Sequence, residues 1–150
     1  MLSQKAKYAL QALLVLAELD EGESLMIGDI AERQRLPKRF LEQILLDLKH
    51  QGVVQSWRGK NGGYALLKPA DKISFGEIVR IIDGPLAPLP CLSRMAYRRC
   101  EDCVSEEKCA VRRVFAGVHE ATTQILDTMT LSAALAGDGV PARELLRNVG

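Results

Sequence analysis

The chain has 150 residues, of which 47% are hydrophobic and 26% are charged, and its formal net charge is +1. These values are typical of a globular protein with an ordinary core, and the near-neutral charge does not by itself indicate a nucleic-acid partner. No apolar leader with a cleavage site opens the sequence, and no apolar run is long enough to span a bilayer, so we expect a cytoplasmic protein without a membrane segment.

The first third of the chain has the periodicity of helices. Apolar residues recur at helical spacing over 3–19, 26–33 and 37–50. Ser3 is placed to cap the first helix, and Pro37 is acceptable in the first turn of the third. We expect the third helix to pack into the core through an apolar face, made of Phe40, Leu41, Ile44, Leu45 and Leu48.

Two short strands are predicted next, at 53–57 and 64–67, followed by a helix at 74–83. The connector 58–63 contains three glycines, which tolerate the positive φ that a hairpin tip requires. Three helices followed by a glycine-tipped hairpin is the order of a winged helix-turn-helix. The predicted fold class is therefore mainly α, with a winged helix-turn-helix DNA-binding domain over 1–83.

Basic residues concentrate on the predicted third helix and hairpin. From Arg33 to Lys60 there are seven Lys or Arg residues and only two acidic ones. Any one of these side chains could simply be solvated, but their clustering favours a surface that binds the phosphates of double-stranded DNA. The residues that we expect to contact DNA are Lys38, Arg39, Glu42 and Gln43 on the helix, and Arg58, Lys60 and Asn61 at the hairpin tip.

The composition changes at Gly84. Three prolines in the next six residues exclude a regular helix, and we expect a cysteine-rich loop over 84–109. A long helix is predicted at 110–130. Its apolar positions alternate spacings of four and three, which is typical of a dimerisation seam: Val111, Phe115, Val118, Ile125 and Met129, with Thr122 in register. We expect 131–150 to be a flexible tail, apart from a turn of helix at 142–147.

All four cysteines, Cys91, Cys100, Cys103 and Cys109, fall within 19 residues of this loop. Thiolates at the spacing C-x8-C-x2-C-x5-C can wrap one soft metal centre, either an iron–sulfur cluster or zinc. A metal-free thiol or disulfide sensor is the third interpretation. Neighbouring Arg and Lys side chains are expected to lower the pKa values of the thiols, although four acidic residues oppose them.

Three stretches resemble the Rrf-type family of bacterial winged helix-turn-helix regulators, which contains iron–sulfur sensors of the IscR, NsrR and RirA type. These stretches are 30–33 (IAER), 40–48 (FLEQILLDL) and 58–66 (RGKNGGYAL), and the resemblance extends over residues 1 to about 129. It implies a homodimer joined by the long helix, bound to a partly palindromic operator. It also implies an iron–sulfur cluster, two-iron or four-iron, held by cysteines just before that helix.

The family pattern has three cysteines, and Cys91, Cys103 and Cys109 match it best. Where some members have a histidine ligand three residues after the last cysteine, this chain has Arg112, and where others have an acidic ligand in the first helix it has Lys7 and Tyr8. The fourth ligand is therefore Cys100, or a residue from elsewhere or from the partner chain.

Two other classes of function compete with DNA-binding regulation. A redox enzyme or electron carrier would use the metal centre catalytically, but the sequence has no cofactor fingerprint and no convincing catalytic dyad, so we do not expect an enzyme. An adaptor would use its winged helix to bind protein, and the basic hairpin weighs against that.

Overall fold

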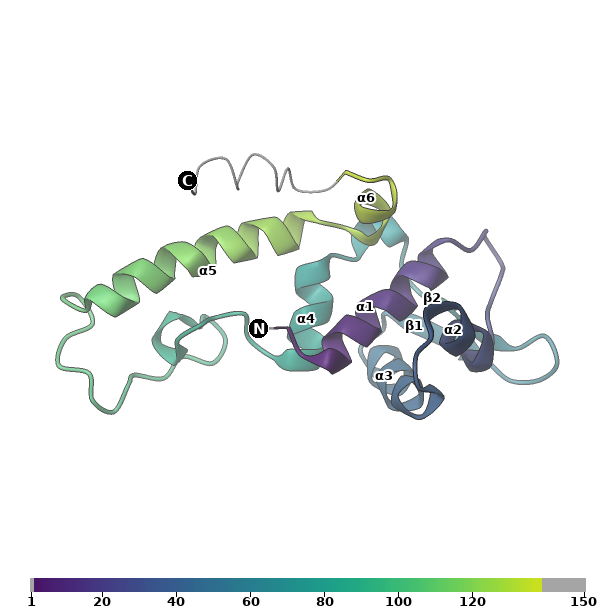
Figure 1. The fold of residues 1–150 in the computed structure, drawn as a ribbon, viewed down its shortest axis with the longest axis horizontal. Helices are drawn as coiled ribbons and strands as arrows, with labels where there is room; N and C mark the ends of the chain where they lie inside the picture. Colours follow the sequence, from purple (N-terminus) through teal and green to yellow (C-terminus); the bar gives the residue numbers. More distant parts are fainter. Residues whose placement is uncertain (1, 139–150) are drawn as a thin grey trace.

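The computed structural model describes residues 2–138 and confirms a mainly helical chain with a winged helix-turn-helix (Figure 1). The helices and strands are α1 (Gln4–Ala17), α2 (Ile27–Gln34), α3 (Lys38–His50), β1 (Val54–Trp57), β2 (Gly63–Leu66), α4 (Phe75–Asp83), α5 (Ala110–Thr128) and α6 (Leu131–Leu135). Two 3₁₀ turns are added at Ala70–Lys72 and Pro90–Leu92. Among the described residues, no helix is both long and apolar enough to cross a membrane.

The core lies where α1 crosses α2, α3 and α4. The buried stripe of α3 has the spacing of one helical face and consists of Leu41, Ile44, Leu45 and Leu48. It packs with Leu13 of α1, Ile30 of α2 and Ile78 of α4, all fully buried. Ser3 caps α1 as expected: its hydroxyl accepts a hydrogen bond from the backbone N–H of Ala6 at 3.0 Å.

Phe40 lies outside this core, so its predicted place on the core face is wrong. Its side chain is 58% exposed, because it precedes the buried stripe by one residue and is rotated away from it. The ring instead forms a T-shaped pair with the ring of Tyr8 on α1, with ring centroids 6.3 Å apart.

The turn of the helix-turn-helix is made without glycine. Arg35 ends α2 in the left-handed region, with φ of 52°. The turn buries Leu36 and sets Pro37 as the N-cap of α3. This left-handed residue therefore fixes the direction in which α3 leaves α2.

The wing is a two-stranded antiparallel hairpin, and a third chain segment pairs with the outer side of β2. Val54 pairs with Leu66 and Trp57 with Gly63. On the other side of β2, Leu25 and Tyr64 exchange two backbone hydrogen bonds, of 3.0 and 2.7 Å. The wing is thus attached to the segment between α1 and α2 as well as to α3.

The long helix α5 extends away from this unit, and the segment 84–109 runs beneath it (Figure 1). At its C-terminal end the chain returns to the DNA-binding unit. The N–H of Phe75 donates to Met129 O at 2.9 Å, and the N–H of Leu131 donates to Ile73 O at 3.0 Å. The base of α5 is therefore joined to the start of α4.

The prediction of a flexible tail from residue 131 is wrong for the first residues of that tail, which are helical. Residues Leu131–Leu135 form α6, Thr130 caps it through the N–H of Ala133 at 3.1 Å, and Leu131 is fully buried in the main core. A five-residue helix has little stability alone, so tertiary packing decides it. The predicted turn at 142–147 lies outside the described residues.

Candidate nucleic-acid interface and cysteine segment

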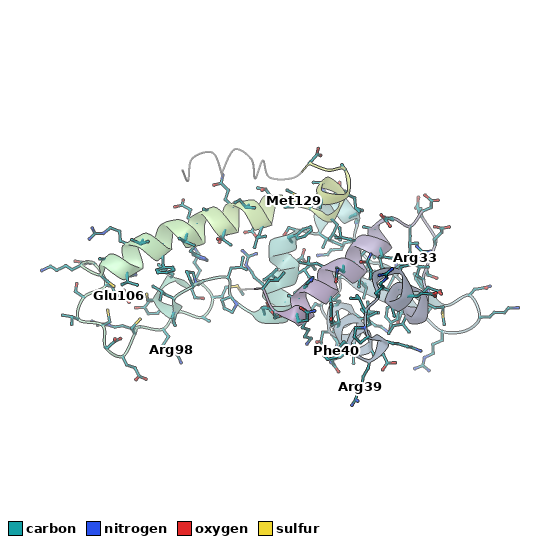
Figure 2. The ribbon with its side chains drawn as sticks, in the orientation of Figure 1. Arg33, Arg39, Phe40, Arg98, Glu106 and Met129 are labelled. Atoms are coloured by element: carbon teal, nitrogen blue, oxygen red, sulfur yellow. The ribbon has the colours of Figure 1, made fainter. Side chains whose placement is uncertain are left out.

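The polar face of α3 is open to solvent. Lys38, Arg39, Glu42 and Gln43 are all exposed, on the side of the helix opposite its buried stripe. Figure 2 shows Arg39 projecting away from the body of the molecule. The structure thus brings together the four helix residues that the sequence predicted, on one accessible surface.

Asp47 positions this helix against α1. Its carboxylate accepts hydrogen bonds from Lys5 Nζ and from Gln43 Nε2, each at 2.8 Å. These bonds, the Lys5 bond first, hold the pKa of Asp47 below its usual value. Gln43 is therefore partly engaged within the protein, and an adenine contact by its amide would compete with Asp47.

The wing tip carries the other three predicted residues. Arg58, Lys60 and Asn61 are exposed, and Gly59 adopts a φ of 100° between them. Gly62 lies so close to the Trp57 carbonyl that a Cβ at this position would overlap it. The glycines therefore fold the tip tightly and leave its basic side chains in solvent.

Sequence reasoning missed the bond that links the wing to α3. Lys49 Nζ donates to Ser56 Oγ at 2.7 Å. No local signal shows such a pair, because the two residues belong to different elements. Through this bond Lys49 orients the hairpin relative to the helix. The exposed residues of α3 and of the wing therefore form one continuous surface.

The four thiols lie in the segment before α5. Cys91 is buried, while Cys100, Cys103 and Cys109 are partly exposed. Partial burial and the neighbouring Cys91 thiol raise the pKa of Cys100, with a smaller contribution from Cys103. For Cys100 the expectation that nearby cations lower the thiol pKa is therefore wrong, because burial, the neighbouring thiols and Asp102 raise it.

Contacts within the segment hold its shape. Tyr97 donates its hydroxyl hydrogen bond to Glu106 at 2.6 Å, which raises the pKa of the phenol, and Arg99 donates to the carbonyl of Cys103 at 3.1 Å. Arg98 and Glu106 mark this end of the molecule in Figure 2. The segment lies at the opposite end of the molecule from the wing tip (Figure 1).

The four cysteine thiols are the type of ligand that a soft metal centre prefers. Cys109 caps α5, its sulfur accepting a hydrogen bond from the backbone N–H of Arg112 at 3.4 Å. Cys91, Cys100 and Cys103 lie near enough for their charges to interact. In residues 2–138, however, no three Cys, His, Asp or Glu side chains are arranged to hold a metal, so binding would require the segment to close around it.

One face of α5 is apolar and exposed. Val111, Val114, Phe115 and Val118 are each at least 40% exposed. Val111, Phe115 and Val118 belong to the predicted seam, and Val114 is an additional exposed residue beside them. The other face, which includes Ala116 and His119, is turned toward the segment 85–95.

The Rrf2 family, described as an iron-dependent transcriptional regulator, matches residues 2–137. An rrf2-like HTH-type transcriptional regulator of Rhodobacter capsulatus is 52% identical over 151 residues, 99% of this chain and 100% of the relative. Among solved structures, CymR, the global cysteine regulator of B. subtilis, superimposes with a TM-score of 0.76 at 29% identity, covering 91% of this chain and 96% of CymR. IscR of T. potens gives a TM-score of 0.70 at 28% identity, covering 92% and 88%.

Proposed function

This chain belongs to the Rrf2 family of transcriptional regulators, and we propose that it acts as a homodimer that reads a partly palindromic operator with α3 and the wing. DNA-binding regulation, and not an enzymatic activity, is what its relatives share. Acting on the chromosome, the protein would work in the cytoplasm.

The exposed surface of α3 and the wing tip is the observation that carries this proposal. Lys38 and Arg39 stand in the first turn of α3, where groove and phosphate contacts concentrate. Glu42 and Gln43 come next along α3 and would contact base edges. At the wing tip, Arg58, Lys60 and Asn61 would reach a flanking phosphate or the minor groove.

The apolar face of α5 supports the dimer. A seam of exposed Val and Phe side chains on a 19-residue helix is the kind of surface that a second copy buries. Pairing along α5 would leave both copies of α3 free. The two recognition helices would then lie about 34 Å apart, one turn of DNA.

For the sensor we propose an iron–sulfur cluster held by Cys91, Cys103 and Cys109, with Cys100 as the additional thiol. The soft donor set and the iron-dependent description of the family support it. Such a cluster would make the segment responsive to iron supply, oxidants or nitric oxide. The cluster would be of the two-iron or four-iron type, and zinc is the alternative metal.

A metal-free thiol sensor is the second candidate, favoured by the four free thiols of one segment and by the effect of the Cys91 thiol on the pKa of Cys100. Oxidising the two thiols to a disulfide would release two protons and two electrons, which hydrogen peroxide takes up to form two water molecules. The similarity to CymR, named as a cysteine regulator, shows that the fold accommodates regulators described in terms other than iron.

A salt series on operator DNA tests the DNA-binding proposal. Binding should weaken steeply with salt, and Arg39→Ala should reduce the slope of log K against log salt by about one if Arg39 meets a phosphate. Lys72→Ala, an exposed lysine outside α3 and the wing, is the control and should bind as the wild type does. Absence of specific binding at every salt concentration would refute the proposal.

Anaerobic purification tests the cofactor. We expect a visible absorption band with iron and sulfide in stoichiometric amounts, which Cys91→Ala and Cys103→Ala should both abolish. A colourless wild type with one zinc per chain would establish the zinc alternative. A colourless, metal-free protein whose Cys91 and Cys100 form a disulfide with peroxide would establish the thiol sensor.

A further inference from the structure

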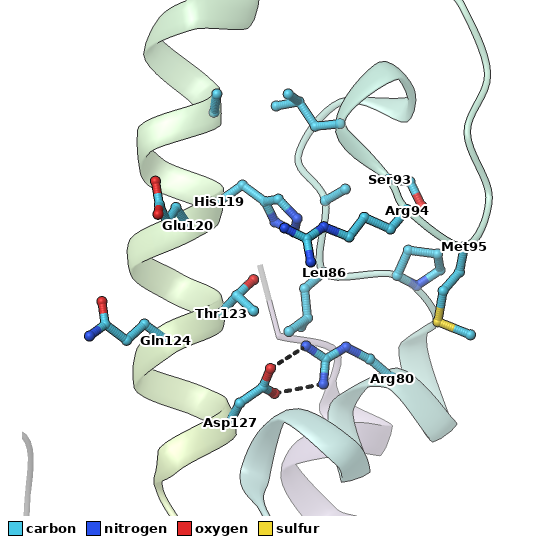
Figure 3. Close-up of a pocket in the computed structure, with 14 residues that line it drawn as sticks. Arg80, Leu86, Ser93, Arg94, Met95, His119, Glu120, Thr123, Gln124 and Asp127 are labelled. Carbon is cyan, nitrogen blue, oxygen red and sulfur yellow. Dashed lines mark hydrogen bonds and ion pairs between the residues drawn. The ribbon is translucent and has the colours of Figure 1, made fainter.

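A cavity of about 800 Å³ separates α5 from α4 and the segment 85–95 (Figure 3). Its volume lies within the usual range of pockets that bind small molecules. One wall belongs to the DNA-binding unit through Arg80 of α4, and the opposite wall is α5, with His119 and Thr123. The cavity is on the side of α5 away from its exposed apolar face, so pairing of two chains along that face would leave it open.

Two polar groups in the α5 wall have no partner. His119 Nδ1 and Thr123 Oγ1 are buried, and within the described part of the chain neither makes a hydrogen bond. Burying such groups unpaired is costly, so they are normally satisfied by something. Figure 3 shows His119 and Thr123 pointing toward the cavity, and Glu120 and Gln124 line the edge of the same helix wall.

The charged residues of the lining are two arginines and two carboxylates, Arg80, Arg94, Glu120 and Asp127. Arg80 is neutralised by Asp127 on the opposite wall. Figure 3 shows the exposed side chain of Arg94 directed toward His119, and among residues 2–138 Arg94 makes no ion pair. Glu120 makes no ion pair in the described residues either, but in Figure 3 its carboxylate is directed away from His119. The side of the cavity next to His119 and Thr123 therefore has Arg94 as its charged group and favours an anion.

Much of the remaining lining is apolar, with Leu86, Leu92, Met95 and Ala116 among its residues, and Ser93 and Gln124 are its other polar members. A ligand that satisfies this surface needs a hydrocarbon part next to its charged end. A monocarboxylate has that chemistry: the carboxylate can meet Arg94 and His119, and the chain can lie against the apolar lining.

We propose that this cavity binds a small organic monocarboxylate. Because its walls come from α4 and α5, bound ligand would fix the position of α5 relative to the DNA-binding unit, and, on the basis of the function proposed above, would change operator affinity. The binding itself does not depend on that function.

The test uses octanoate and its neutral counterpart octanamide, titrated into the full-length protein without DNA and followed by calorimetry. We expect octanoate to bind and octanamide to bind at least tenfold more weakly, because the amide lacks the charge that Arg94 recognises. Equal affinity for the two compounds, or no binding of octanoate at millimolar concentration, would overturn the proposal.

Two variants with matched controls locate the site. Arg94→Gln should weaken octanoate binding about tenfold, whereas Arg98→Gln, an exposed arginine of the same segment that does not line the cavity, should leave it unchanged. Equal losses in both variants would contradict the site, since they would indicate only a general effect of positive charge.

Thr123→Val separates a ligand-binding hydroxyl from a structural one. It removes an unpaired hydroxyl at nearly constant volume, so the melting temperature should stay the same or rise while octanoate affinity falls at least threefold. The control is Thr128→Val, which removes a hydroxyl already bonded to the carbonyl of Gln124 at 2.8 Å and should not affect octanoate affinity. If Thr123→Val left octanoate affinity unchanged, the Thr123 hydroxyl would not be a ligand-binding group.

An operator titration with and without octanoate tests the regulatory consequence. If octanoate binds but operator affinity is unchanged, the cavity is a binding site without the regulatory role. If the protein binds octanoate but no operator, the function proposed above has failed while the site stands.

Discussion

Arg80 of α4 and Asp127 of α5 form a two-point ion pair, with Nη1 to Oδ1 at 2.6 Å and Nη2 to Oδ2 at 2.9 Å (Figure 3). The carboxylate raises the pKa of Arg80. Gly76 permits this approach, since a Cβ there would overlap the Asp127 carboxylate. The pair fixes the long helix to the DNA-binding unit at the floor of the cavity.

Asp127→Asn should therefore lower the free energy of unfolding by about 1 kcal/mol, a modest value because both side chains remain partly exposed. For a chain of this length that corresponds to a fall in melting temperature of about 2–4 °C, measurable by calorimetry. Asp71→Asn, at an exposed carboxylate without an ion pair in the described residues, is the control and should melt as the wild type does.

Gly63→Ala should destabilise the wing. Gly63 has a φ of 138°, and an added Cβ would meet the Leu25 carbonyl oxygen at 2.5 Å, so both backbone strain and a clash oppose the change. We expect a loss of about 2 kcal/mol or more in urea unfolding. Gly59→Ala has positive φ but open space around it, and should lose only about 1 kcal/mol; equal losses would show that the clash is relieved.

The Lys5–Asp47 pair should make stability depend on acid pH. The folded pKa of Asp47 is below its ordinary value of 3.8, so the pair stabilises the fold fully above that pH and loses its effect as pH falls through the folded pKa. At pH 6, Asp47→Asn should be less stable by at most about 1 kcal/mol, since both side chains are partly exposed. In urea unfolding the difference should shrink below pH 3.8, and a constant difference would disprove the linkage.

Val118→Asp should prevent the proposed dimer. Val118 is 49% exposed in the middle of the apolar face of α5, and pairing would bury the new charge. Light scattering after gel filtration should give a dimer for the wild type and a monomer for the variant. Gln124→Asp adds the same charge on the opposite face and should remain dimeric; a dimeric Val118→Asp protein would place the interface elsewhere.

The regular elements of the chain could be predicted closely from sequence because their signals are local. The expected helix 37–50 became Lys38–His50, and the expected hairpin became Val54–Trp57 paired with Gly63–Leu66. Periodicity, glycines and caps act within a few residues, so each can be recognised without knowing the rest of the fold.

The candidate DNA-binding residues were also predictable as a group, since polar side chains opposite a buried helical stripe must face solvent. The exposure of Phe40 was not, because a hydrophobic residue beside that stripe is placed by its neighbour Tyr8 on another helix. The raised pKa of Cys100 depends in the same way on which groups the folded segment brings near it.

By itself, the sequence determined the order of helices and hairpin, the basic surface and the gathering of four cysteines, because these depend on spacing along the chain. The tertiary structure alone decided that Leu131 enters the core, that Lys49 meets Ser56 and that Arg80 meets Asp127. Those contacts join residues far apart or in separate elements, and their energies exist only once packing has brought the partners together.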